Sequence, residues 1–161
     1  MPKHLDYCTL LANPEDEDIL TRRLFDVNLR LMKTSSEYRE IVTKAAKYIL
    51  WGSMTEKEGY KKPHGFSGAN AGIPWNIIAV GDKVMLNPHI IRTKGSQISL
   101  SNCGSLLLDH PIKIMRHAHV CIEYWDLVGD RHLIEGYLPT HQHEIDHNLG
   151  TLIIDLAVGA S

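Results

Sequence analysis

The segment His143-Glu144-Ile145-Asp146-His147 constrains this chain more than any other feature of its sequence. Residues four positions apart lie on one face of an α-helix, so the imidazoles of His143 and His147 can approach a single metal ion. Glu144 lies beside them, where its carboxylate can take a proton from metal-bound water. With ten histidines in the chain, about 0.03 chance occurrences of the pattern are expected. The sequence therefore predicts a helical site for a divalent metal ion.

A catalytic site of this type needs a third protein ligand, and the helix does not supply one. Ile153 stands where metzincins carry a third histidine, and no glutamate follows His147. The third ligand therefore comes from upstream. Cys103 is the favoured candidate, because the neighbouring Gly104 lets backbone approach a ligand closely. Cys121 is the alternative, although it alternates with apolar residues, where a free cysteine usually packs as a small hydrophobe.

Length and composition indicate one globular domain over residues 1–161. The 17 basic and 19 acidic residues give a net charge of −2, which argues against nucleic-acid binding. The sequence contains no apolar run long enough to span a bilayer, and its first residues lack the core of a signal peptide. Its three cysteines do not make a disulfide framework. We expect a cytoplasmic protein that binds neither membranes nor nucleic acid.

Helical periodicity predicts three helices. The first covers residues 15–33, the second opens at a capping box from Thr34 to Glu37, and the third covers residues 140–156. Residues 52–65 are predicted to form a loop. Strands are predicted at residues 77–80, 84–86, 98–100, 106–108, 117–124 and 132–137, with a hairpin turn at 126–130. This order predicts an α+β fold, with antiparallel β-sheets packed around a C-terminal metal-binding helix and with N-terminal helices.

With these motifs in view, the chain resembles the peptide deformylase family. The family motif Gln-His-Glu-x-Asp-His is matched in full by residues 142–147. Its motif Glu-Gly-Cys-Leu-Ser is matched in part by residues 101–105, and its glycine-rich motif is echoed by residues 63–72. Residues 85–90 and 120–129 resemble further strand and turn segments of the family. The resemblance extends over most of the chain beyond the N-terminal helices.

The resemblance implies hydrolytic removal of the formyl group from the N-terminal methionine of nascent peptides. The implied metal ligands are Cys103, His143 and His147. Glu144 would serve as general acid and base, working with metal-bound hydroxide. The family commonly uses Fe(II), which is the implied cofactor, while Zn, Ni or Co are compatible with the same ligands.

Further residues are implied around this centre. The side-chain amide of Asn70 and the backbone N–H of Gly104 would stabilise the oxyanion, each contributing about 3 kcal/mol. Asp146 and Gln142 would support the ligands from outside, by orienting an imidazole or the helix start. An extended peptide could pair with backbone near Gly65. The residues predicted to bind substrate are His64, Gly65, Phe66, Asn102 and Thr140.

Some positions depart from the family pattern. Asn70 stands where the family has a glutamine, which shortens the reach of the amide by one methylene. Ser101 replaces a glutamate that normally pairs with an arginine, and Arg116 is the counterpart of that arginine. Thr140 and His141 replace residues that are usually apolar and line the methionine pocket. These changes bear on substrate preference more than on metal binding.

N-formylmethionyl peptides are the expected partners. Lys and Arg are absent after Arg131, so we expect no strong intrinsic docking on the ribosome. Separately, we expect the protein to be a monomer or a weak dimer. The expected location is the cytoplasm, either of the cell itself or of a phage host. Three alternatives stay open: a closed structural metal site that uses Cys121, a catalytically impaired metal-binding relative, and a hydrolase of another N-formyl or N-acyl substrate.

Overall fold

The computed structural model describes residues 23–55, 64–101, 111–151 and 153–158. Its antiparallel sheet has the strand order β1-β2-β3-β4-β5, with β1 Gly65–Ser67, β2 Ile77–Val80, β3 Lys83–Ser101, β4 Ile112–Trp125 and β5 Arg131–Gly136. The helices are α2 Leu29–Thr34, α3 Ser36–Met54, α4 Gly68–Ala71, α5 Pro139–Asn148 and the 3-10 helix η2 Ile153–Leu156. The predicted α+β class with antiparallel strands is confirmed. No helix in the described ranges is both long enough and apolar enough to cross a membrane.

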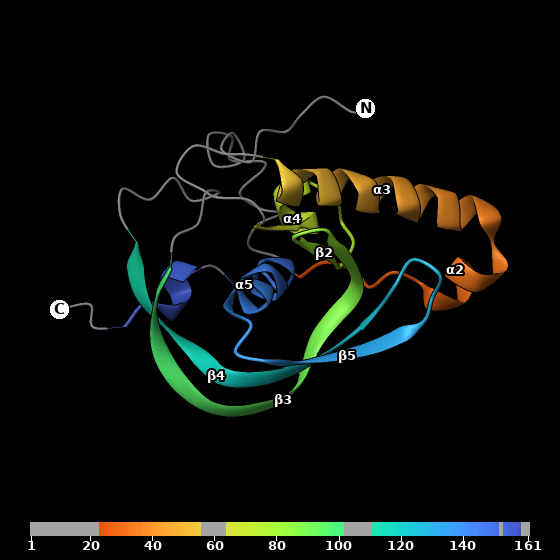
Figure 1. The fold of residues 1–161 in the computed structure, drawn as a ribbon. Coiled ribbons are helices and arrows are strands. Elements are labelled where there is room, and N and C mark those ends of the chain that lie inside the picture. Colours follow the sequence, from red (N-terminus) through yellow and green to blue (C-terminus); the bar gives the residue numbers. More distant parts are fainter. Residues whose placement is uncertain (1–22, 56–63, 102–110, 152, 159–161) are drawn as a thin grey trace.

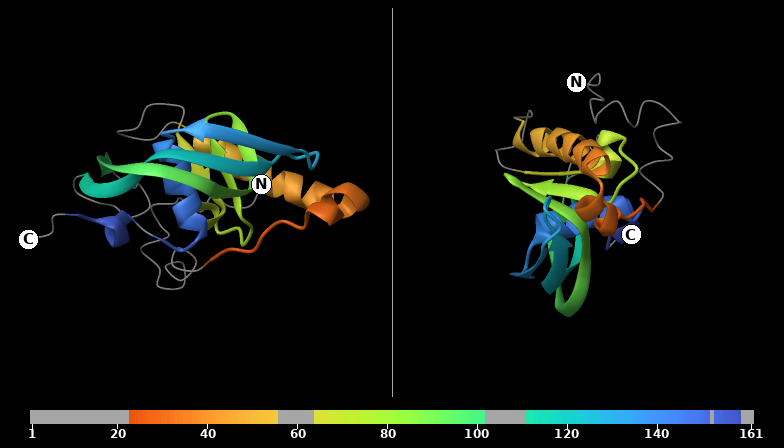
Figure 2. Two further views of the ribbon diagram at one scale, coloured as in Figure 1. Left: turned by 90° about the horizontal axis from the view of Figure 1, so that it is seen from below. Right: turned by 90° about the vertical axis from the view of Figure 1, so that its right-hand side faces the viewer.

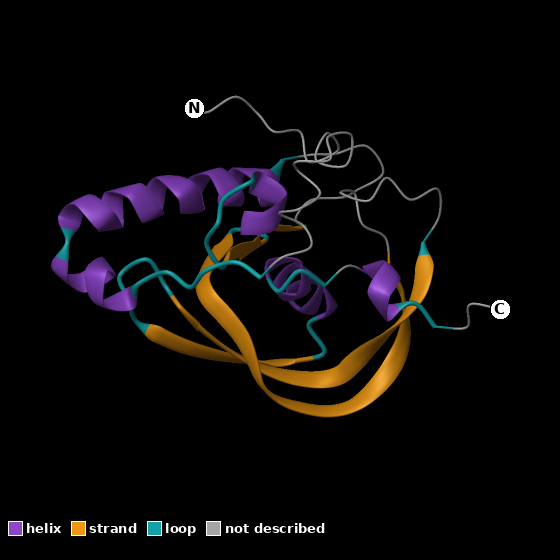
Figure 3. Ribbon diagram, turned by 180° about the vertical axis from the view of Figure 1, so that it is seen from behind, coloured by secondary structure: helices purple, strands orange, loops and turns teal. Residues whose placement is uncertain are grey.

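Helix α5 lies in the hollow of the curved sheet. Figure 1 shows the long strands β3 and β4 bending around it, while α3 covers the opposite side of β2. The view from behind shows the same enclosure of α5 (Figure 3), and the right-hand view of Figure 2 shows α3 as a layer separate from the long strands. A helix placed in this way has backbone and side chains on most of its sides, so its polar residues must find partners inside the protein.

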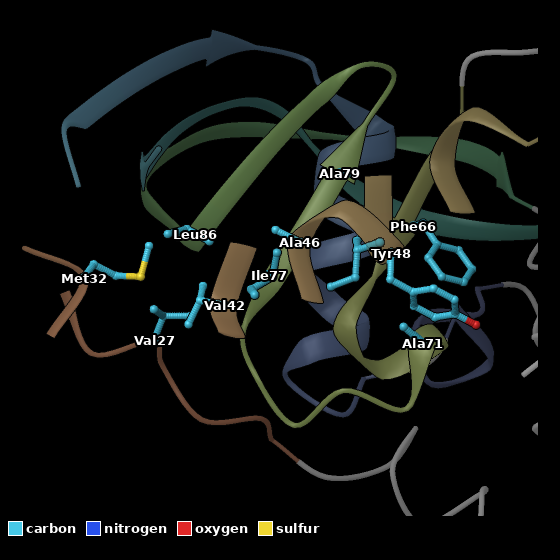
Figure 4. Packing of buried hydrophobic residues seen from close by; sticks show 11 residues of the cluster. Val27, Met32, Val42, Ala46, Tyr48, Phe66, Ala71, Ile77, Ala79 and Leu86 are labelled. Atoms are coloured by element: carbon cyan, nitrogen blue, oxygen red, sulfur yellow. The ribbon is translucent and has the colours of Figure 1, made fainter. Parts of the chain in front are cut away.

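Strand β2 serves two layers at once. Ile77 and Ala79 pack toward α3, whereas Ile78 packs toward Ile145 of α5, and the three strand residues have no exposed surface. Both faces of β2 are thus covered by helices, which explains its uninterrupted apolar run. The cluster on the α3 side (Figure 4) consists of Val27, Met32, Val42, Ala46, Tyr48, Ile49, Phe66, Ala71, Ile77, Ala79 and Leu86.

Two buried amides attach α5 to the rest of the fold. Gln142 accepts from the backbone N–H of His117 and donates to its carbonyl, both at 3.1 Å, in the manner of a strand neighbour. At the other end, Asn148 accepts from the N–H of Ala69 at 3.2 Å. Its Nδ2 donates to Asn76 Oδ1 and to the Ile77 carbonyl, both at 3.0 Å. The position of the helix is therefore set by specific hydrogen bonds as well as by apolar packing.

Replacing Asn148 by Ala is expected to lower the free energy of unfolding by about 2–4 kcal/mol, because three partners lose their hydrogen bonds and two of those bonds are fully buried. Urea denaturation followed by circular dichroism measures this change. The neighbouring substitution Leu149→Ala is the control, because Leu149 is exposed at the end of α5. A loss for Asn148→Ala no larger than that of the control would contradict the anchoring role.

The helix predicted over residues 15–33 is wrong for residues 23–28, which are extended, and residues 15–22 lie outside the described part. The side chain of Asn87 binds both backbone groups of Val27: its Oδ1 accepts from the N–H at 2.7 Å, and its Nδ2 donates to the carbonyl at 2.9 Å. Backbone groups that are used in this way cannot take part in helical hydrogen bonds. A tertiary contact 60 residues away in sequence thus overrides the local periodicity.

The second helix begins one residue later than predicted and ends later. Ser35, rather than Thr34, is its N-cap, with a backbone N–H donating to its side chain at 3.2 Å. The helix continues to Met54, into the predicted loop at residues 52–65, and Gly52 packs directly under Phe66. A Cβ on Gly52 would lie 2.3 Å from Cδ1 of that ring, so the glycine here permits close packing rather than breaking the helix.

The third helix, predicted over residues 140–156, ends at Asn148. Gly150 has a φ of +79°, a left-handed conformation that terminates helices and favours glycine. Leu149, which follows the last residue of the helix, is 44% exposed. A short 3-10 helix then occupies residues 153–156.

The predicted strands at residues 84–86 and 98–100 are parts of one strand, β3, which runs past two register irregularities with β4. The run at 106–108 lies outside the described residues. The hairpin turn at 126–130 is confirmed, with Gly129 at a φ of +87°. The predicted strands 77–80, 117–124 and 132–137 are confirmed within β2, β4 and β5, except for residue 137.

Candidate metal centre

Helix α5 brings the two motif histidines together. The Nε2 atoms of His143 and His147 are 3.1 Å apart, and the two rings meet edge to face at 86°. Two imidazole nitrogens that bind one tetrahedral ion at 2.0–2.1 Å lie about 3.3 Å from each other. The predicted pair is therefore already arranged to share an ion.

Both imidazoles are held in their neutral form. Burial lowers the pKa of His147 to about 4, with a further contribution from the positive charge of Arg116. Burial also lowers the pKa of His143 well below its ordinary value, assisted by His147 and by Arg116. A neutral imidazole keeps a lone pair for a metal ion. Protonation therefore does not compete with metal binding at neutral pH.

The metal-free protein is expected to lose stability as the pH falls from about 6.5 toward about 4. In that interval the unfolded chain binds protons at these histidines and the folded chain does not, so proton uptake favours unfolding. Urea midpoints measured at several pH values in the presence of a chelator test this. A flat profile between these pH values would contradict the burial of neutral imidazoles. The variant His132→Gln is the control, because His132 is a partly exposed histidine on β5.

Glu144 is buried directly beneath the backbone of β1. A Cβ on Gly65 would lie 2.6 Å from Cγ of Glu144 and 2.8 Å from Cγ2 of Thr140. Only glycine lets the strand approach the helix this closely. Three predicted site residues, Gly65, Glu144 and Thr140, are thus brought together at the contact between β1 and α5.

Asn70 is buried on α4 and its amide is held in place. Its Oδ1 accepts from the backbone N–H of Ser67 at 3.2 Å and from the Ser67 hydroxyl at 2.8 Å, forming a capping box. These hydrogen bonds hold Oδ1 of Asn70 against Ser67. The Nδ2 group, on the other side of the amide, therefore faces away from Ser67. The bond from Ala69 to Asn148 ties α4 to α5.

The other predicted residues of the glycine-rich segment flank this contact. The backbone of His64 is bonded on both sides, to the Ser53 carbonyl at 3.3 Å and to the N–H of Gly81 at 3.0 Å. The ring of Phe66 lies on the opposite face of β1 from the contact between Gly65 and α5. It packs into the cluster on the α3 side (Figure 4). The backbone of Phe66, rather than its ring, is therefore the part that lies toward the candidate centre.

The predicted residues Asn102, Cys103 and Gly104 lie outside the described residues. Within the described ranges, His, Cys, Asp and Glu side chains form no cluster of three that could hold a metal ion. Cys121 does not fill the gap, because its neighbours Val120 and Ile122 pack toward α5 and a strand points successive side chains to opposite faces. The third ligand thus stays a prediction.

Sequence reasoning missed how Asp146 is connected to the histidines. Its carboxylate accepts from Nη1 of the buried Arg116, and Nη2 of the same guanidinium lies 3.4 Å from Nδ1 of His143. Burial raises the pKa of Asp146, and the neighbouring Arg116 offsets part of that effect. The sequence indicated that Arg116 had lost its usual acidic partner at Ser101, but no local pattern identified Asp146 as its partner.

The comparison with known families gives a match over residues 30–160 to the family described as polypeptide deformylase. A peptide deformylase of Streptococcus pyogenes is 31% identical over 120 residues, which is 71% of this chain and 52% of that protein. The chain spans about half or less of the length of the curated relatives it matches.

Two solved structures show the same fold. A Plasmodium falciparum peptide deformylase in complex with an inhibitor has a TM-score of 0.67 and 27% identity, covering 87% of this chain and 84% of that one. A peptide deformylase from Thermotoga maritima has a TM-score of 0.71 at 21% identity, covering 88% and 92%. At that lower identity the likeness concerns the fold alone.

Proposed function

This chain belongs to the polypeptide deformylase family, and from that premise we propose that it hydrolyses the formyl group of peptides that begin with N-formylmethionine. One observation carries the proposal: the Nε2 atoms of His143 and His147 converge to 3.1 Å on a buried helix, with Glu144 between them in sequence. A purely structural metal site has no use for a buried carboxylate in that position.

The residues present fit a divalent metal ion. Two neutral imidazoles at the right separation supply two ligands, and we propose Cys103 as the third, which leaves one position for water. A bound ion would act as a Lewis acid and lower the pKa of that water. The family is metal-dependent. Imidazole and thiolate ligands suit Fe(II), Zn, Co and Ni, and we propose Fe(II) as the native ion.

The chain's own groups carry out the proton transfers. Glu144 takes a proton from the attacking water and later gives it to the departing amine, so one carboxylate acts as base and then as acid. Its burial keeps bulk water from competing for that proton. We propose Nδ2 of Asn70 and the N–H of Gly104 as donors to the formyl oxygen as negative charge develops on it.

The substrate is proposed to lie along β1. This strand is at the edge of the described sheet, so an extended peptide can add to it by backbone hydrogen bonds. Gly65 keeps this part of the strand close to Glu144. The remaining residues proposed to line the path are His64, Phe66, Asn102 and Thr140. Three further expectations stay predictions: a single domain over residues 1–161, a monomeric or weakly dimeric state, and action in the cytoplasm.

Formate release from formyl-Met peptides tests the function. Protein purified without oxygen and loaded separately with Fe(II), Co, Ni or Zn is expected to turn over the formyl peptide and not its acetyl counterpart. Turnover of the acetyl peptide alone would assign a different N-acyl substrate. Metal binding without turnover of either peptide, with all four ions, would contradict the proposal and identify an impaired relative.

A further inference from the structure

A buried cation lies beside one of the proposed metal ligands. The side chain of Arg116 extends from β4 to α5 and is only 4% exposed. Its Nη2 lies 3.4 Å from Nδ1 of His143, whose Nε2 is the proposed ligand atom. A positive charge this close to a ligand opposes the binding of a divalent cation, and burial leaves little solvent to screen it. The site needs a compensating charge.

Metal binding also changes which ring nitrogen of His143 carries the proton, and this affects the contact with Arg116. Without a metal ion, Arg116 can donate to Nδ1 while Nε2–H donates to His147. When Nε2 binds an ion, a neutral ring must carry its proton on Nδ1 instead. That proton points toward the guanidinium, so the weak attraction between Arg116 and His143 becomes a repulsion. Something other than His143 must then hold Arg116.

Asp146 is the group placed to do so. Its carboxylate accepts from Nη1 of Arg116, on the same guanidinium whose Nη2 faces His143. Asp146 and His143 are three residues apart on α5, so the helix presents both to one arginine from β4. The ion pair is charge-assisted and largely buried, which makes it a strong local constraint.

We propose that Asp146 is a positioning residue of the metal centre: it neutralises Arg116 and so allows His143 to bind a divalent ion. This inference rests on the proposed function, since it needs the metal centre to exist. If it holds, the negative charge of Asp146 affects metal affinity only by neutralising Arg116. Removing both charges should therefore be less harmful to metal binding than removing the carboxylate by itself.

Metal affinity, measured by competition with a chromophoric chelator, tests the proposal without using activity. Asp146→Asn is expected to weaken the binding of Zn or Co by about 10- to 100-fold. The double variant Arg116→Met with Asp146→Asn should recover most of that loss, because it carries no buried cation beside His143 and leaves no charge without a partner. At saturating cobalt, the visible spectra of all variants should match the wild-type spectrum, because the ligands are unchanged.

The exposed pair between Arg92 and Glu135 provides a matched control. Nη2 of Arg92 lies 2.6 Å from Oε1 of Glu135, but the two side chains are 70% and 50% exposed, respectively. The substitution Glu135→Gln should therefore leave metal affinity unchanged. Circular dichroism confirms folding, and Asp146→Ser replaces Asp146→Asn if the latter does not fold.

Three outcomes would count against the inference. Wild-type affinity in the single variant would overturn it, and so would a double variant as weak as the single one, which would show a structural role only. A wild-type chain that binds no metal would overturn the proposed function as well.

Discussion

Replacing Glu144 by Gln is expected to lower kcat for formyl-peptide hydrolysis by about 10²- to 10⁴-fold. Glutamine keeps the shape of the side chain beneath Gly65, so the contact between β1 and α5 should persist. It cannot accept the proton of water or return it to the amine, so the proton-transfer steps lose their catalyst. Steady-state kinetics on metal-loaded protein measure the effect, with KM expected to change little.

Metal content separates this role from a structural one. The Glu144→Gln variant should bind as much metal as the wild type, because the proposed ligands are His143, His147 and Cys103. Loss of metal together with activity would show that Glu144 is itself a ligand or a support for one. Activity within about tenfold of wild type would remove it from the proton transfers altogether.

Replacing His147 by Ala is expected to weaken metal binding by at least about a hundredfold. Zinc sites with four ligands bind with about 10–16 kcal/mol, so one ligand accounts for roughly 3 kcal/mol. Formyl-peptide hydrolysis at limiting metal should fall in parallel. Equilibrium titration of chelator-treated protein with Zn or Co measures the affinity directly.

His141 offers a control on the same helix. It lies on the same helix, N-terminal to both His143 and His147, is partly exposed, and is not a proposed ligand. His141→Ala should therefore keep the wild-type affinity. Equal losses in the two variants would mean that helix integrity, rather than a particular imidazole, determines binding.

The central motif of the site was predictable because it is local. An i, i+4 pair on one helix needs no knowledge of the tertiary fold, because helix geometry alone places both imidazoles on one face. The structure then shows their Nε2 atoms 3.1 Å apart. The approach of Gly65 to Glu144 was predictable only through the resemblance, since the two residues lie far apart in the sequence. The fold class likewise followed from the order of helical and strand-like segments.

The features that the sequence did not reveal depend on distant partners. Val27 lies in an apolar pattern that suits a helix, yet Asn87 takes both of its backbone groups. Gly52 looks like a helix breaker, and only the position of Phe66 shows why a glycine belongs inside α3. Local propensity is a weak preference, and a few buried hydrogen bonds or one close contact outweigh it.

The polar supports of the site were hidden for the same reason. Asn148 follows the motif directly, but its three hydrogen bonds reach α4 and the start of β2, which no periodicity indicates. Asp146 was expected to orient a ligand, whereas the structure shows that it reaches His143 through Arg116. A charge pair between a strand and a helix leaves no repeating pattern in a single sequence.

The position of a bound ion is the most direct test of this account. Crystals of cobalt- or zinc-loaded protein, measured at the absorption edge of the metal, should show one anomalous peak. We expect this peak about 2.0–2.1 Å from Nε2 of both His143 and His147, and about 2.3 Å from Sγ of Cys103. A peak away from the two histidines, or a fourth side chain closing the position meant for water, would contradict it.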